Sequence, residues 1–258
     1  MNTARMLGAV IAAAAATSAS AGTIYGVSTY APFAPAGLYA IDTGTGAATL
    51  IGSTGVDRIN GIAWNPGNNT MYAYSFDGEL YTLNLTTGAA TFVADQPVIV
   101  PEGDIAIAPT GAFHITDANE LSILNGVTAA ITPIGLMGTA ADDVSGLIFG
   151  GNGSLYGYAK NGAASDTLVS LNPGTGAATT IGNLGFNANL NVGGLTFGAD
   201  GVMYLTDGAT LFSVNPNTGA STFIGSHGTS QFSGLAVPAP GVGALAGLVM
   251  LGAARRRR

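Results

Sequence analysis

The sequence GLYAIDTGTGAATLIG, from Gly37 to Gly52, returns four more times along the chain in modified form. The further copies begin at residues 79, 120, 167 and 210 and read ELYTLNLTTGAATFVA, ELSILNGVTAAITPIG, TLVSLNPGTGAATTIG and TLFSVNPNTGASTFIG. A repeat of about 40 to 45 residues that is rich in short strands is typical of a β-propeller blade. The repeat therefore decides which fold we expect.

Ahead of each copy after the first lie two more apolar runs, such as GIAW from Gly61 and MYAY from Met71. Each unit thus predicts four strands, which we name A to D in chain order. The first unit has a B strand at 24–27 but no A strand, and the last segment, 232–237, is an A strand without a unit. The sequence predicts an all-β, five-bladed β-propeller of four-stranded antiparallel blades over 22–237, closed by the C-terminal strand 232–237 pairing in the first blade.

The turn between strands C and D has its own chemistry. In four units an Asp or Asn precedes a Gly by four positions, as Asp42 precedes Gly46. The Asx side chain caps the turn, and the Gly supplies a positive φ. The third unit has Asn125 but Ala129, so we expect its turn to differ.

The composition limits the partners. The 258 residues include 40 Gly and no Cys, which excludes disulfides and thiol chemistry. Between residues 22 and 238 the only basic residues are Arg58 and Lys160, against all 14 acids. Nucleic acid and anionic lipid both need positive potential, so we expect neither as a partner of this body. Cations, neutral glycans and basic surfaces remain open, as does simple adaptation to a salty medium.

Both ends of the chain contain targeting patterns. Residues 1–21 read as a secretory signal peptide, with Arg5, an apolar stretch and the cleavage site ASA. Residues 238–258 continue the motif VPAP into an apolar stretch and end in four arginines, Arg255 to Arg258. This order resembles the PEP-CTERM sorting signal of Gram-negative bacteria, although Ala239 stands where that family usually has Glu.

The resemblance implies processing by an exosortase-type enzyme near the motif and delivery to the cell surface or extracellular matrix. A tail that is removed leaves no membrane-spanning helix. The alternative is a permanent C-terminal anchor, and the tail would then be the only contact with the membrane. The repeat itself is similar to those of uncharacterised secreted bacterial propeller proteins with LYxID…TGAAT units, which informs the fold and not the activity.

The topology predicts where the acidic residues lie. In a propeller the D–A and B–C connections share one face, and sorting by loop leaves only Asp42 and Asp200 for the other face. Asp104 stands where the other A strands have Gly, so we expect it near the mouth of the central channel. Carboxylates around such a mouth suit Ca²⁺, which prefers six to eight oxygen ligands. The candidate ligands are Asp104, Glu102, Asp142, Asp143 and Asp57. The alternative is that longer surface loops simply collect acids.

No residue set argues for catalysis. His114 and His227 have no companion ligand at metal spacing, and packing is the expected role of Trp64. We expect a noncatalytic structural or binding protein of the cell surface or matrix, which contacts extracellular polysaccharide or a surface protein. Bound Ca²⁺ would assist this contact. The alternative is an extracellular hydrolase, a glycosidase or lactonase-like enzyme, that uses channel-mouth carboxylates.

Overall fold

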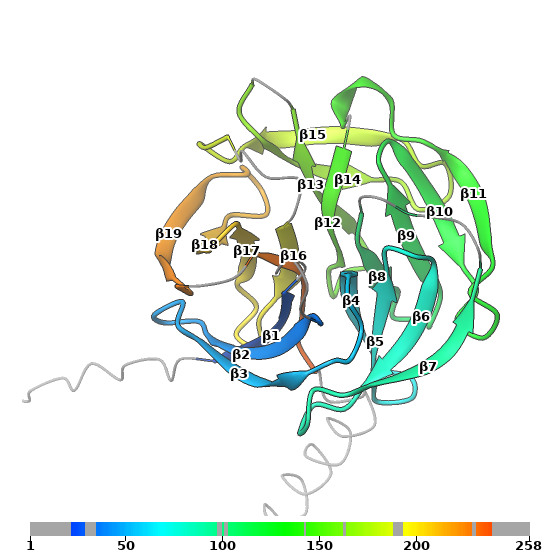
Figure 1. Cartoon of the computed structure of the whole chain (residues 1–258). Helices are drawn as coiled ribbons and strands as arrows, with labels where there is room; N and C mark the ends of the chain where they lie inside the picture. The colour runs from blue at the N-terminus through cyan, green and yellow to red at the C-terminus, as the bar shows by residue number, and fades with distance from the viewer. Residues whose placement is uncertain are drawn as a thin grey trace, which may run out of the picture.

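The computed structural model describes residues 22–28, 35–96, 100, 103–141, 143–161, 164–187, 193–228 and 231–238. Within these ranges the chain forms twenty strands and one 3-10 turn, η1 (Gly138–Ala140). The strands make five four-stranded antiparallel sheets, arranged around an axis as the blades of a propeller (Figure 1). The predicted fold class is therefore confirmed. The predicted signal peptide (1–21) and all but the first residue of the predicted tail (238–258) lie outside the described residues.

Each blade runs from an inner strand at the axis to an outer strand at the rim. The inner strands of blades 1 to 5 are β20 (Phe232–Ala236), β4 (Ile59–Asn65), β8 (Ile105–Ile107), β12 (Asp143–Phe149) and β16 (Gly193–Phe197). The second strands are β1 (Thr23–Ser28), β5 (Thr70–Ser75), β9 (Phe113–Asp117), β13 (Leu155–Lys160) and β17 (Met203–Asp207). The third strands are β2 (Gly37–Asp42), β6 (Glu79–Leu83), β10 (Glu120–Leu124), β14 (Thr167–Leu171) and β18 (Thr210–Val214). The outer strands are β3 (Ala48–Ser53), β7 (Ala90–Asp95), β11 (Ile131–Leu136), β15 (Ala178–Asn183) and β19 (Ser221–Ser226).

Blade 1 closes the ring as predicted. Its sheet order is β20-β1-β2-β3, so the last strand of the propeller pairs with the first. Tyr25 lies opposite Ala236 in this antiparallel pair, and Phe232 and Leu235 are fully buried. The N- and C-terminal strands of the propeller therefore share one blade and one core, and their pairing closes the ring.

The inner strands approach one another closely because four of them carry Gly at the same position. A Cβ on Gly234 would lie 2.6 Å from the backbone nitrogen of Ile62, and one on Gly194 would lie 2.6 Å from that of Leu235. Both distances are far inside van der Waals contact. Larger side chains at these positions would push adjacent blades apart, so Gly sets the radius of the central ring.

The outer half of each blade locks against the turn of the next one. Every C–D strand pair contains a β-bulge, and in blade 1 it places Gly52 beside the turn of blade 2. Gly88 in that turn has φ +79°, and a Cβ there would lie 2.5 Å from the carbonyl oxygen of Gly52. Between blades 2 and 3 both positions are Ala instead, Ala94 and Ala129. Ala129 keeps the left-handed conformation, with φ +56°, and its N–H donates to the carbonyl oxygen of Asn125 as in the other units. The expectation that this turn would differ is therefore wrong.

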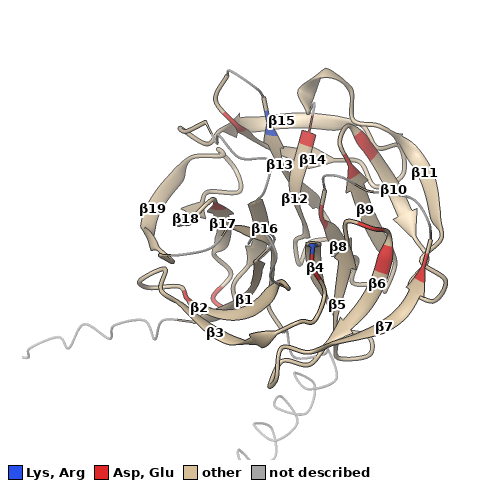
Figure 2. Cartoon of the chain, in the orientation of Figure 1, with Lys and Arg blue, Asp and Glu red and all other residues tan. Residues whose placement is uncertain are grey.

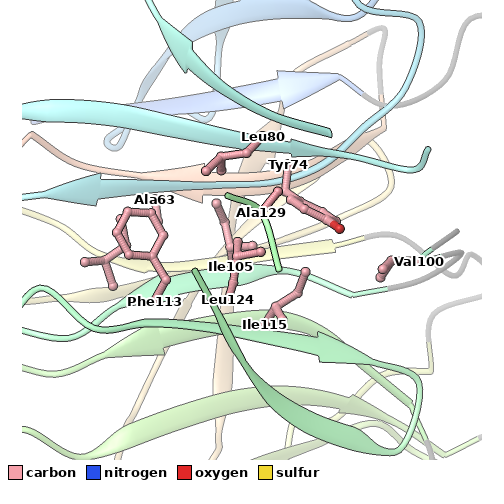
Figure 3. Close-up of a cluster of buried hydrophobic side chains, with 10 residues drawn as sticks. Ala63, Tyr74, Leu80, Val100, Ile105, Phe113, Ile115, Leu124 and Ala129 are labelled. Carbon is pink, nitrogen blue, oxygen red and sulfur yellow. The ribbon is translucent and has the colours of Figure 1, made fainter. Parts of the chain in front are cut away.

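The core consists of apolar layers between neighbouring blades. Figure 3 shows the layer between blades 2 and 3, where Tyr74 and Leu80 face Ile105 and Ile115. Trp64 packs against the corresponding layer between blades 1 and 2, in agreement with its expected role. No helix in the described part of the chain is long and apolar enough to cross a membrane.

Candidate functional site on the acidic face

The acidic residues gather at one end of the blades, as the loop assignment predicted. The D–A and B–C connections lie on the same face, and among the described acids only Asp42 and Asp200 lie in the C–D and A–B connections of the opposite face. Figure 2 shows how few basic residues accompany them. We call this end the acidic face.

Asp104 lies at the axis but is not exposed at a channel mouth. Its side chain takes the place of the ring Gly in blade 3 and is only 1% exposed. Oδ1 accepts a hydrogen bond from the backbone N–H of Ile105 at 2.8 Å, and Oδ2 accepts one from Leu147 of blade 4 at 3.1 Å. Burial raises the pKa of Asp104 well above its usual range, and hydrogen bonds from Leu147, Ile105 and Ile62 oppose that rise. The carboxylate therefore fills the ring and binds backbone donors of three blades.

The other candidate Ca²⁺ ligands are spread over the face. Asp57 is exposed before β4, and Asp143 is half-buried at the start of β12. Glu102 and Asp142 lie outside the described residues. Within the described residues, no three His, Asp or Glu side chains come close enough to hold a metal ion. The calcium site stays a prediction.

A second cluster, which the sequence analysis did not single out, lies at the junction of blades 4 and 5. Lys160 ends β13 opposite Asp143 of β12 and is only 6% exposed. The hydroxyl of Tyr158 donates a hydrogen bond to Oδ2 of Asp166 at 3.0 Å, and Asp166 is 1% exposed. Asp207 of blade 5 completes what we call the lysine cluster: Asp143, Tyr158, Lys160, Asp166 and Asp207.

The lysine cluster has perturbed proton affinities. Burial raises the pKa of Asp207 to about 6; the positive charge of Lys160 opposes this rise, and the negative charge of Asp166 adds to it. Burial also raises the pKa of Tyr158, with further contributions from Asp207 and Asp166. Of these two groups only Asp207 can take up and release a proton near neutral pH, whereas Tyr158 stays protonated there. The signal in the sequence was Lys160 itself, one of only two basic residues of the body.

The other basic residue is at the surface. Arg58 lies 3.5 Å from Oδ1 of Asp77, and both side chains are about half exposed. Its guanidinium also lies 3.6 Å from the ring centre of Phe76. An exposed ion pair of this length adds little to stability.

A pocket of about 180 Å³ opens on the acidic face between blades 2 and 3. Asp117, Glu120 and Ser122 form its polar side. The apolar side consists of Val100, Ile115, Ile131 and Pro133. In the aligned repeats Ser122 stands where three other copies have Tyr39, Tyr81 and Phe212 and the fourth has Val169. The repeat comparison could have revealed this loss of an aromatic ring, although not the space it leaves.

A second, more open groove lies on the opposite face, beside Trp64. It has a volume of about 440 Å³ and includes Asn69, Thr82, Asn84 and Thr91 in its lining. Asn69 and Asn84 belong to the A–B and C–D turns of blade 2, and Thr82 and Thr91 belong to its strands β6 and β7. The residues that line this groove are uncharged, polar and apolar side chains.

Comparisons with known proteins support the fold and go no further. No family model matches the chain, and no curated protein matches it. A Bacteroides thetaiotaomicron protein of unknown function has a TM-score of 0.54 and 15% identity, over 84% of this chain and 62% of its own. A chain of a nidogen/laminin complex has a TM-score of 0.56 and 12% identity, over 85% and 99%. TolB from Acinetobacter baumannii has a TM-score of 0.50 and 12% identity, over 84% and 66%.

Fold and site together define a class. The chain is a five-bladed β-propeller protein whose described acidic residues lie mainly on one face. The similar structures are propellers as well, and at these identities the likeness concerns the fold alone.

Proposed function

We propose that this protein is an exported, noncatalytic binding propeller that presents its acidic face to a positively charged partner at the cell surface or in the extracellular matrix. The observation that carries this proposal is the segregation of charge. Of the acids that the structure describes, only Asp42 and Asp200 lie away from that face, and the body contains only two basic residues.

The electrostatics define the kind of partner. Like charges gathered on one face create a negative potential that attracts cationic surfaces and accelerates encounter with them. Such attraction between exposed charges is screened over about 8 Å at physiological salt. We therefore expect an amino-bearing polysaccharide or a basic surface protein as partner, and a binding affinity that falls as salt is added.

The state of Asp104 supports a binding role over a catalytic one. A general acid or a nucleophile must reach its substrate. Both oxygens of Asp104 instead accept backbone hydrogen bonds in the closed ring. Export is inferred from the signal peptide of residues 1–21, and surface delivery by an exosortase-type enzyme from the tail of residues 238–258; both segments are sequence predictions.

The test is a binding assay of the full chain on immobilised polysaccharides that differ in charge. We expect retention on a cationic, amino-bearing polymer and none on an anionic one, with retention lost between about 50 and 300 mM salt. A face variant, Asp57→Asn with Asp77→Asn and Asp95→Asn, should bind more weakly. The matched control, Asp42→Asn with Asp200→Asn on the opposite face, should bind like the wild type. Equal retention of both variants would contradict the proposal.

A hydrolase is the second candidate, and the lysine cluster is the observation that favours it. Perturbed pKa values in buried groups often mark catalytic sites. An assay with chromogenic glycosides and lactones decides between the two functions. Turnover that disappears in Lys160→Met and Asp207→Asn would support the hydrolase, whereas no turnover of any substrate would leave the binding role.

A further inference from the structure

Blade 2 contains the groove beside Trp64, at the end of the blade that lies away from the acidic face. Its strands are ordered β4-β5-β6-β7 from the axis to the rim (Figure 1). All four strands contribute lining residues, from Trp64 on β4 to Thr91 on β7. The volume of about 440 Å³ lies within the roughly 300–1,000 Å³ of small-molecule sites. We call this site the Trp64 groove, and its lining includes Trp64, Asn69, Thr82, Asn84, Leu85 and Thr91.

The apolar side of the groove consists of residues that are larger than their counterparts in the other repeats. Trp64 is the only Trp of the chain and stands where strand A of the other blades has Val, Ile or Phe. Leu85 lies in the C–D turn, where the other copies have Thr, Gly or Pro. Both side chains pack against the core layer between blades 1 and 2, and both also line the groove. The core therefore holds the indole in place, and the ring has little freedom to lose when a ligand binds.

The polar side of the groove consists of amide and hydroxyl groups. In the C–D turn, Oδ1 of Asn84 accepts hydrogen bonds from the N–H groups of Thr86 and Thr87 at 2.9 and 3.1 Å. The turn uses only the oxygen of this exposed amide, so its Nδ2 group can donate to a ligand. Thr82 and Thr91 lie directly opposite each other in the β6–β7 pair, and both line the groove. Each hydroxyl is a donor and an acceptor.

The A–B turn of blade 2 is one residue longer than those of blades 3, 4 and 5. Six residues separate Trp64 from Met71, whereas five separate the corresponding Phe149 and Leu155 of blade 4. Asn69 in this turn has the left-handed conformation, with φ +53°, where the other three turns have Gly. Gly adopts that conformation more readily than a residue with a side chain. Blade 2 thus has an exposed amide at the groove where the other blades have no side chain.

The lining defines the class of ligand because it is uncharged. The described acids of this face, Asp42 and Asp200, belong to blades 1 and 5. An ammonium, carboxylate or phosphate group would lose its water in the groove without gaining an opposite charge, which is costly. A hydrocarbon would cover the amides and hydroxyls without replacing their hydrogen bonds to water. A neutral sugar suits both sides, because a pyranose ring has an apolar C–H face and a rim of hydroxyl groups.

We propose that the Trp64 groove binds a neutral pyranose unit of a polysaccharide. The C–H face of the sugar packs on the indole of Trp64 and on Leu85. The sugar hydroxyls bond to the amides of Asn69 and Asn84 and to the threonine hydroxyls beside them. This site lies on the face opposite the acidic one, so the inference goes beyond the proposed function and does not depend on it. A propeller with both sites binds a cationic partner on one face and a neutral glycan on the other.

The experiment follows the fluorescence of Trp64 while the full chain is titrated with neutral β-1,4-linked tetrasaccharides of glucose, mannose, galactose and xylose. Because the chain has a single Trp, a saturable change reports on the groove. We expect such a change with at least one of the four, at an affinity that stays constant between about 50 and 300 mM salt because no charges are paired. The tetramers of glucosamine and galacturonic acid are charged counterparts of two of these probes, and they should bind at least about tenfold more weakly.

Three variants test the lining by calorimetry with the tetrasaccharide that binds most tightly. Asn69→Gly restores the residue of the other blades and relieves a positive φ, so it should fold and yet bind roughly three- to tenfold more weakly. Asn84→Asp keeps the cap of the turn, as Asp42 does in blade 1, but removes the Nδ2 donors and should weaken binding by a similar factor. Trp64→Phe introduces the residue of blades 4 and 5 and should weaken binding roughly tenfold.

The matched control is Asn172→Asp, the same change in the equivalent turn of blade 4, which should bind like the wild type. Three results of the titrations would overturn the site. They are no saturable change with any neutral tetrasaccharide, equal affinity for the charged and neutral tetramers, and tighter binding of 1-hexanol than of any sugar. Wild-type affinity in both Asn69→Gly and Asn84→Asp would overturn it as well. Thermal melts of all variants are compared, and the two Asn variants decide if Trp64→Phe does not fold.

The Trp64 groove and the acidic face can fail separately. The face variant with Asp57→Asn, Asp77→Asn and Asp95→Asn should lose retention on the cationic polymer and keep its affinity for the tetrasaccharide. Asn69→Gly should show the reverse. Sugar binding without retention of the wild type on the cationic polymer would overturn only the proposed function, and retention without sugar binding would overturn only the Trp64 groove.

Discussion

Oδ2 of Asp104, at the start of blade 3, accepts a hydrogen bond from the backbone N–H of Leu147 in blade 4 over 3.1 Å. One side chain thus satisfies a backbone donor of the neighbouring blade at the closed centre of the ring. A Cβ on Gly61 of blade 2 would collide with Oδ1 of the same carboxylate. Asp104 therefore links three blades where every other blade has only Gly.

Replacing Asp104 by Gly tests this structural role. Asp104→Gly restores the residue of the other blades but leaves the buried N–H groups of Ile105 and Leu147 without an acceptor. Each buried donor that loses its partner costs about 1–3 kcal/mol. With two such donors, we expect the free energy of unfolding in urea to fall by about 2–6 kcal/mol. Asp57→Asn, an exposed control, should change it by less than about 0.5 kcal/mol. A wild-type value for Asp104→Gly would mean that the carboxylate contributes nothing to the ring.

The rim contacts predict an asymmetry between two small substitutions. Gly88→Ala forces a Cβ into a positive-φ residue and to within 2.5 Å of the carbonyl oxygen of Gly52, so we expect a loss of about 2 kcal/mol or more. Ala129→Gly relieves a positive φ at the equivalent turn but removes a buried methyl group, and we expect a change within about 1 kcal/mol. Urea unfolding measures both. Equal losses for the two variants would contradict the difference between the junctions.

The fold was predictable because its determinants are local and repeated. The Asx residues that cap the C–D turns do so in the structure, where Oδ1 of Asp42 accepts hydrogen bonds from Gly44 and Thr45. The first unit lacks an A strand, and the strand at 232–237 has no unit of its own. Pairing the two predicts how the ring closes. The sorting of the acidic residues by face also followed from the strand order, because consecutive antiparallel strands place their connections at opposite ends of a blade in turn.

The sites were less predictable because they depend on contacts between blades. Loop position placed Asp104 at the axis but could not say that its side chain turns into the ring. In the lysine cluster Asp207 of blade 5 lies near Lys160 of blade 4. No motif in either copy of the repeat predicts this contact between blades. Ser122 is visible as a departure from the repeat, but whether space remains beside it depends on what Tyr74 and the neighbouring loop fill.

The calcium prediction is tested by thermal melts of the full chain in EDTA, Ca²⁺ and Mg²⁺ at equal ionic strength. A ligand that binds only the folded state raises the melting temperature. We expect a rise with Ca²⁺ alone that Asp143→Asn removes. Asp104→Asn should leave the rise in place, since both oxygens of Asp104 are already hydrogen-bonded. Identical curves in Ca²⁺ and Mg²⁺ would leave the acidic face without a calcium site.

The lysine cluster predicts a pH dependence of stability. The pKa of Asp207 is raised from 3.8 to about 6 in the folded protein, so between those values the folded state binds more protons than the unfolded state. The contribution of Asp207 to stability is therefore present below about pH 4 and is lost as the pH rises toward 6. Asp207→Asn cannot titrate, and it should gain stability relative to the wild type as the pH rises through this window.

Urea unfolding at pH 4, 5, 6 and 7 measures that difference. Lys160 provides an internal control, because its positive charge lowers the pKa of Asp207. In Lys160→Met the pKa of Asp207 should rise further. The free energy of unfolding of Lys160→Met, compared with that of the double variant Lys160→Met with Asp207→Asn, should therefore continue to fall above pH 6. Parallel stability curves for the wild type and Asp207→Asn from pH 4 to 7 would show that Asp207 does not titrate in this window. The observation that favours a hydrolase, a carboxyl group with a pKa near neutral in the lysine cluster, would then be lost.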